Sequence, residues 1–168
     1  MAETRAYSNK WSSAPGCIET EPADITVYGK IPEEIDGTNV YRIMADPFYP
    51  PSPENNIPIG RDGHISASRI CNGQVDMKTK YVDTERRTLE QRASTRLFGL
   101  YRNPFTHRPC IRAAVDSMAN RNMVYWAHRL LALREVALPY KVDPNTLDTI
   151  KYDLFDLAIL DVVVYVLN

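Results

Sequence analysis

Hydrophobic and polar residues alternate over short stretches of this chain, and glycine or proline separates one stretch from the next. Up to about residue 75 this spacing leaves room for short strands and little room for long helices. Ile25–Tyr28 and Val40–Met44 alternate over strand-like lengths, with turn composition at Gly29–Pro32 between them. A proline-rich loop from Asp46 to Pro58 follows. The pattern predicts a β-rich fold.

The next two alternating stretches, Gly63–Ile70 and Val75–Val82, flank the dipeptide Asn72-Gly73. Both residues of this pair tolerate a positive φ, which a tight two-residue turn requires, so the sequence predicts a β-hairpin. One side of the second arm carries Val75, Met77, Thr79 and Tyr81, and the other carries Asp76, Lys78 and Lys80. Because side chains alternate across a strand, we expect the first face to be buried and the second to be exposed.

The second half of the chain begins with a charged segment, Thr84–Arg96, which lacks glycine and proline. It predicts an exposed helix or an extended loop on the surface. Met123–Ala127 and Arg129–Glu135 are two further predicted strands, separated at His128. Asp143-Pro144-Asn145, within Pro139–Leu147, then has turn composition. Short strands joined by turns are typical of a sandwich, a barrel or part of a propeller.

Composition narrows the class of protein. The chain has 168 residues, which suits a single domain, and its 20 Lys+Arg against 21 Asp+Glu disfavour a nucleic-acid binder. Cys17, Cys71 and Cys110 are too scattered for a disulfide framework or a zinc cluster, so we expect reduced, partly buried thiols.

The longest apolar stretch, Leu157–Leu167, contains Asp161 and is too short to cross a membrane. The N-terminus lacks a signal-peptide pattern, and we expect a cytoplasmic protein without a transmembrane segment.

Several short segments follow one another in a characteristic order. They are Asp24–Pro32 with Gly37-Thr38, Asp62-Gly63, Asn72-Gly73, and Leu130–Glu135 followed by Pro139-Tyr140. In this order and spacing they resemble the carotenoid cleavage oxygenases. Tyr101–Thr106 and residues 113–135 are most similar to the fungal and bacterial branch that cleaves resveratrol-like or lignostilbene-like substrates. The resemblance covers about residues 3–153, which divides the chain into an N-terminal propeller portion, 1–153, and a divergent apolar tail, 154–168.

The resemblance implies an all-β fold, the incomplete N-terminal part of a seven-bladed β-propeller. It also implies Fe(II) held by four histidines and the oxidative scission of a carbon–carbon double bond in an apolar or phenolic olefin. The family's first iron ligand follows the region of Asp153, where this chain has no histidine, so all four ligands are missing. We therefore expect a truncated or misread product that is inactive alone and self-associates through exposed strand edges. The alternative is a non-catalytic β-rich module that binds a partner or an apolar ligand.

The resemblance also assigns residues to a site. Glu135 matches a glutamate that accepts a hydrogen bond from an iron-binding histidine. Tyr101 and Arg134 match a tyrosine and a lysine around the phenolic hydroxyl of the substrate, and Phe98 matches a residue that lines the substrate tunnel. The alternatives are a strand-end charge for Glu135, a packed aromatic residue for Tyr101 and a surface charge for Arg134.

The remaining histidines and tryptophans receive no catalytic role. His64, His107 and His128 do not match the family's iron ligands, and we expect them to be exposed or locally hydrogen-bonded. We assign no metal ligand and no catalytic residue in this chain. We expect Trp11 and Trp126 to lie in the core.

Overall fold

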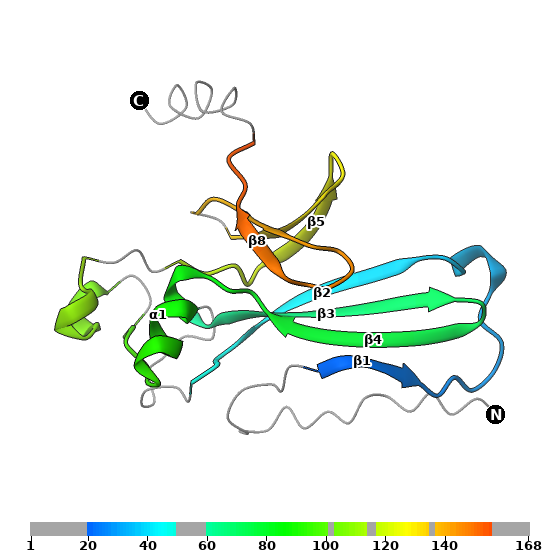
Figure 1. Ribbon diagram of the computed structural model, residues 1–168, viewed down its shortest axis with the longest axis horizontal. Helices are drawn as coiled ribbons and strands as arrows, with labels where there is room; N and C mark the ends of the chain where they lie inside the picture. Colours follow the sequence, from blue (N-terminus) through cyan, green and yellow to red (C-terminus); the bar gives the residue numbers. More distant parts are fainter. Residues whose placement is uncertain (1–19, 50–59, 101–102, 114–116, 135–136, 156–168) are drawn as a thin grey trace.

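The computed structural model describes residues 20–49, 60–100, 103–113, 117–134 and 137–155 (Figure 1). These residues form two four-stranded antiparallel sheets and one α-helix, α1 (Glu85–Ala93). Sheet A has the order β1-β4-β3-β2 and sheet B the order β5-β6-β7-β8. Sheet A contains β1 (Thr20–Ile25), β2 (Asn39–Asp46), β3 (Asp62–Cys71) and β4 (Gln74–Tyr81). Sheet B contains β5 (Asn122–Trp126), β6 (Arg129–Leu133), β7 (Tyr140–Val142) and β8 (Thr149–Tyr152). Short 3₁₀ turns lie at Glu33–Ile35, Pro104–Thr106 and Pro109–Ile111.

Two tight turns fix the hairpins that the sequence predicts. Between β3 and β4, Asn72 and Gly73 have φ values of 52° and 72°. Between β5 and β6, Ala127 and His128 have φ values of 48° and 59°. Positive φ at both central positions is the geometry whose twist matches that of the flanking strands. The predicted Asn-Gly hairpin and the strand break at His128 are therefore both confirmed, and sheet B is an up-and-down meander of the kind that forms a propeller blade.

The first strand lies earlier in the chain than predicted. β1 ends at Ile25, whereas the alternating pattern predicts a strand that begins there. Ile25 pairs with Val75, next to the residue at which β4 begins. Residues after Ile25 lie beyond the end of β4. They therefore have no β4 residues to pair with, although their sequence alternates like that of a strand. The predicted strand at Val40–Met44 is confirmed as part of β2.

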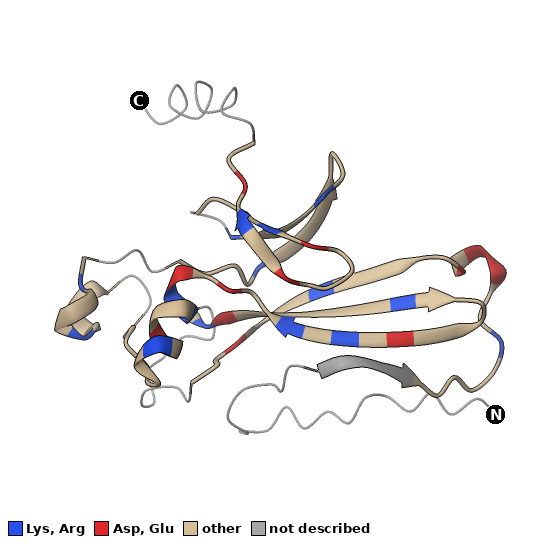
Figure 2. Cartoon of the chain, in the orientation of Figure 1, with Lys and Arg blue, Asp and Glu red and all other residues tan. Residues whose placement is uncertain are grey.

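The core lies between the two sheets. Its buried residues come from both sheets and the connecting segments: Ile65, Val82, Ala119, Leu130, Ala132, Tyr140, Val142 and Leu147. In β4, only Thr79 and Tyr81 are buried, while Val75 and Met77 are half-buried, as are the charged residues of the other face (Figure 2). The expected contrast between faces is thus confirmed only at the C-terminal end of β4. Figure 1 shows the reason, because the β3–β4 hairpin projects past sheet B and its far end has no sheet above it.

α1 confirms the helix alternative for Thr84–Arg96 and corrects the expected exposure on one face. Thr84 caps the helix by accepting a hydrogen bond from the Arg87 backbone N–H at 3.2 Å, and Ser94 ends it in the left-handed conformation. Arg86, Arg87 and Glu90 are nevertheless buried. A charge-rich sequence is usually solvated, but here buried charges of opposite sign compensate one another.

Other expectations also change. Trp126 is 52% exposed at the end of β5 and does not belong to the core. Cys71 and Cys110 are free thiols, as expected, but they are exposed. Trp11, Cys17 and the apolar tail from residue 156 onward lie outside the described residues. Among the described residues, no helix has the length and apolar character needed to span a membrane.

Candidate functional site

Two of the four predicted site residues lie in the described part of the chain. Phe98 follows α1 and is 1% exposed. Arg134 directly follows β6 and is half-buried. Tyr101 and Glu135 lie outside the described residues, so their roles stay predictions.

The Phe98 ring is enclosed by side chains from several segments. It packs in a small apolar cluster with Leu97, Ile111 and Leu89. The His107 ring meets it edge-on at 5.2 Å between centroids, and the Arg86 guanidinium carbon lies 5.3 Å from its centre. A cation over an aromatic face is stabilising, more so when both groups are desolvated. Among the described residues Phe98 is a packing residue, and its contact with a substrate stays a prediction.

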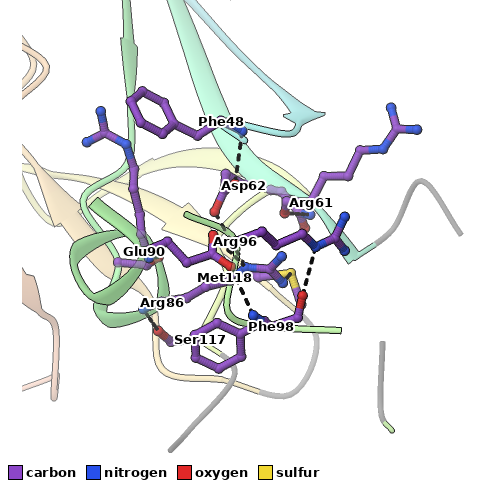
Figure 3. Close-up of polar contacts among 12 residues, drawn as sticks. Phe48, Arg61, Asp62, Arg86, Glu90, Arg96, Phe98, Ser117 and Met118 are labelled. Atoms are coloured by element: carbon purple, nitrogen blue, oxygen red, sulfur yellow. Dashed lines mark hydrogen bonds and ion pairs between the residues drawn. The ribbon is translucent and has the colours of Figure 1, made fainter. Parts of the chain in front are cut away.

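A buried cluster of charges lies beside Phe98 (Figure 3). The Arg86 Nε atom is 3.7 Å from Asp62 Oδ1 and 3.9 Å from Glu90 Oε2, and all three side chains are at most 4% exposed. Burial raises the pKa of Glu90, and the Arg86 guanidinium opposes this shift, as do the hydrogen bonds from the Phe98 and Leu97 amides. One guanidinium therefore helps to keep two carboxylates in the interior.

The charge cluster connects three parts of the chain. Asp62 opens β3, and its Oδ2 atom accepts a hydrogen bond from the Phe48 amide at 3.1 Å. The Arg86 amide in α1 donates to Ser117 Oγ at 3.2 Å. The cluster thereby joins the start of β3, the helix and the segment that precedes β5.

A second polar cluster joins α1 to sheet B. Glu85 accepts hydrogen bonds from the hydroxyls of Tyr140 and Tyr152, the latter at 2.5 Å, and the two rings lie 4.2 Å apart. Burial opposes ionisation of Glu85, but the bonds from the two tyrosines prevail and lower its pKa. Burial and the bond to Glu85 raise the pKa of Tyr140. The sequence gives no signal for this cluster, because Glu85 is 55 and 67 residues from its partners.

The histidines do not form a metal site in the described part of the chain. His128 is exposed at the β5–β6 turn, and buried His107 accepts a hydrogen bond from the Gly99 amide at 3.0 Å, so both match the expectation. His64 is buried on β3 with its ring 4.5 Å from that of Tyr81, so the expected exposure does not hold for it. No group of three or more His, Cys, Asp or Glu side chains among the described residues could hold a metal ion. With three histidines in the whole sequence, the chain does not fit a site of four imidazoles.

A small pocket lies elsewhere, between sheet A and the turn that follows β7. It has a volume of about 120 Å³, and Tyr41, Arg69, Lys78 and Asn145 are among its lining residues. Neither Phe98 nor Arg134 lines it. The pocket is therefore not the site that the sequence predicts.

The two four-stranded antiparallel sheets are typical of part of a β-propeller, and the comparison with known families agrees. The sequence matches the family described as RPE65, retinal pigment epithelial membrane protein, over residues 13–162. The chain belongs to this family, that of the carotenoid oxygenases.

Individual relatives lie in the stilbene-cleaving branch. The chain is 56% identical over 159 residues to resveratrol cleavage oxygenase 1 of Botryotinia fuckeliana, covering 90% of this chain and 28% of that protein. It is 34% identical over 139 residues to lignostilbene-alpha,beta-dioxygenase isozyme III of Sphingomonas paucimobilis, covering 83% of this chain and 28% of that protein. The chain thus spans little more than a quarter of the length of these relatives.

A solved structure agrees with the fold. The crystal structure of Pseudomonas brassicacearum lignostilbene dioxygenase matches with a TM-score of 0.78 and 36% identity, covering 86% of this chain and 30% of that one. The predicted all-β fold, forming part of a carotenoid oxygenase β-propeller, is therefore confirmed.

Proposed function

We propose that this chain is the N-terminal portion of an Fe(II)-dependent oxygenase that cleaves the central double bond of phenolic stilbenes such as resveratrol. The observation that carries the proposal is the 56% identity over 159 residues to a resveratrol cleavage oxygenase. The reaction splits the olefin into two carbonyl compounds, with molecular oxygen as the oxidant. As part of this proposal, the enzyme works in the cytoplasm, which cell fractionation would test.

The chain's own residues act on the phenolic end of the substrate. Tyr101 and Arg134 contact its hydroxyl, where the guanidinium favours the phenolate because an opposite charge stabilises an ionised group. Arginine supplies charge but does not accept a proton, since its pKa stays above about 12. Phe98 belongs to the apolar wall of the substrate passage, and Glu135 orients a histidine that the remainder of the enzyme contributes.

The lone chain is inactive under this proposal. Three histidines cannot supply four imidazole ligands, so iron binding requires segments that this sequence does not contain. When bound, the iron would activate oxygen, and the part of the site described above would hold the olefin beside it. Reading the gene past the codon for Asn168 in all three frames would show whether the missing histidines are encoded there.

A chimera tests the proposal directly. Residues 1–153 of this chain would replace the matching portion of the Botryotinia relative, and the product would be loaded with Fe(II) under anaerobic conditions. We expect the chimera to take up oxygen, measured with an oxygen electrode, and to form two aldehydes from resveratrol, measured by chromatography. We expect neither oxygen uptake nor aldehyde formation from the lone chain.

A folded, iron-loaded chimera that leaves resveratrol intact would overturn the substrate assignment. If the lone chain instead retained an apolar ligand without turnover, the non-catalytic β-rich module would become the better interpretation. Cleavage of resveratrol by the lone chain would overturn its inactivity.

A further inference from the structure

The segment Leu97–Leu100 has no regular secondary structure, yet all four of its amide N–H groups are hydrogen-bonded to side chains. Glu90 Oε1 accepts from the first two amides at 2.9 and 3.0 Å (Figure 3). His107 Nδ1 accepts from the third amide at 3.0 Å, and Thr106 Oγ1 accepts from the fourth at 2.7 Å. Backbone groups are usually satisfied by other backbone groups, so a run of four amides held by side chains is unusual.

The carbonyl groups of the same segment are also bonded. The Leu97 carbonyl accepts from the Arg108 amide at 3.0 Å. Arg96 Nε donates to the Phe98 carbonyl at 2.8 Å, and its Nη2 donates to the Gly99 carbonyl at 3.4 Å. The segment is thereby held from three sides, by Glu90 of α1, by residues 106–108 and by the Arg96 side chain.

Gly99 allows the segment Leu97–Leu100 to lie very close to Thr106. A Cβ atom at this position would lie 2.3 Å from both the carbonyl oxygen and the Oγ1 of Thr106. This is well inside van der Waals contact, so only a residue without a side chain fits here. The close approach keeps the His107 and Thr106 acceptors within reach of the segment.

The carboxylate that holds the segment is energetically costly. Glu90 is 1% exposed, and desolvation of a charged group is unfavourable unless partners compensate it. Arg86 supplies a cation 3.9 Å away, and the two amides supply hydrogen bonds. An apolar residue at position 90 would avoid this desolvation cost but could not accept hydrogen bonds from the Leu97 and Phe98 amides. We therefore explain the buried Glu90 carboxylate by its role in fixing the backbone of the segment.

We propose that Glu90 and His107 are positioning residues that latch the segment Leu97–Leu100, so that Phe98 keeps one place relative to α1. The role of this latch toward a substrate rests on the proposed function, in which Phe98 belongs to the apolar wall of the substrate passage. Preorganisation of this kind lowers the ordering cost when a ligand binds. Glu90 and His107 themselves act through the backbone of the segment.

Hydrogen–deuterium exchange of the intact chain, resolved at single amides by mass spectrometry, tests the latch without iron or substrate. In Glu90→Ala we expect the Leu97 and Phe98 amides to exchange at least about tenfold faster, because each loses its acceptor. In His107→Ala we expect the same acceleration at the Gly99 amide alone. Amides of β6 serve as an internal reference, since they lie in the core sheet.

Conservative variants separate positioning from general stability. Glu90→Gln keeps an acceptor oxygen, and His107→Asn places its side-chain oxygen near the position of Nδ1, so both should restore slow exchange at least in part. They also keep the test decisive if an alanine variant fails to fold. Gln91→Ala, at an exposed neighbour in α1, and His128→Asn, at an exposed turn, are matched controls that should leave the segment unchanged.

Two results would overturn the latch. One is slow exchange of the segment in both alanine variants. The other is an equal acceleration of β6 and of the segment, which would mean that the side chains only stabilise the whole domain. An inactive chimera would count against the proposed function and leave the exchange result standing, so the two failures are distinguishable.

Discussion

Replacing Arg86 by methionine removes the cation that lies between Asp62 and Glu90. All three side chains are at most 4% exposed, so solvent screens their interactions little. Breaking a buried ion pair by removing one partner costs about 3–5 kcal/mol, because the remaining charge stays buried without compensation. The variant also loses the guanidinium over the Phe98 ring, worth about 1–2 kcal/mol when desolvated. We expect a loss of at least about 3 kcal/mol in the free energy of unfolding.

The loss should depend on pH in a defined direction. Burial raises the pKa of Glu90 in the folded chain, and Arg86 opposes that shift. Without Arg86 the folded-state pKa of Glu90 rises further above its unfolded value. A carboxyl with a raised folded-state pKa favours folding at acid pH, and this contribution disappears as the pH rises through the folded-state value. The deficit of Arg86→Met should therefore be smaller at about pH 5 than at about pH 7.5.

Urea unfolding followed by far-UV circular dichroism at these two pH values measures both effects. Arg92→Met is the matched control, because Arg92 is an exposed arginine in the last turn of the same helix. We expect this control to change the free energy of unfolding by less than about 0.5 kcal/mol at either pH. The reasoning would be refuted if Arg86→Met cost no more than Arg92→Met, or if its deficit grew on acidification.

Four further predictions follow from the fold and the proposed function. Gly99→Ala should cost about 1–3 kcal/mol in urea unfolding, because its Cβ would lie 2.3 Å from the Thr106 carbonyl oxygen; an unchanged midpoint would contradict this close packing. The lone chain should hold no stoichiometric iron in elemental analysis after anaerobic loading, and one tightly bound iron per chain would contradict that. It should self-associate in light scattering at micromolar concentration, less so when residues after Asp153 are removed, and a monomer at that concentration would count against this. In the chimera, Arg134→Lys should raise turnover of resveratrol near neutral pH, since lysine can relay a proton and arginine cannot, and Tyr101→Phe should lower it in either background. Equal loss on a stilbene without the 4-hydroxyl would mean that these two residues only pack.

Local chemistry determined much of the strand architecture. Asn72-Gly73 tolerates positive φ at both turn positions, so the β3–β4 hairpin follows from neighbours in the sequence. The alternation on either side of His128 likewise predicted β5 and β6. The position of β1 did not follow, because a strand ends where its partner ends, and β4 is about 50 residues further along the chain.

The candidate site was likewise determined partly by the sequence and partly by tertiary packing. The resemblance pointed to Phe98, but the charge pattern of residues 84–96 predicted a solvated surface, and only tertiary packing placed Arg86 and Glu90 in the interior. Asp62, which shares the guanidinium with Glu90, comes from the start of another strand. A one-dimensional pattern shows how many charges a segment carries, but the cost of burying one depends on which distant groups surround it. That arrangement was decided when sheet A, α1 and the segment before β5 packed together.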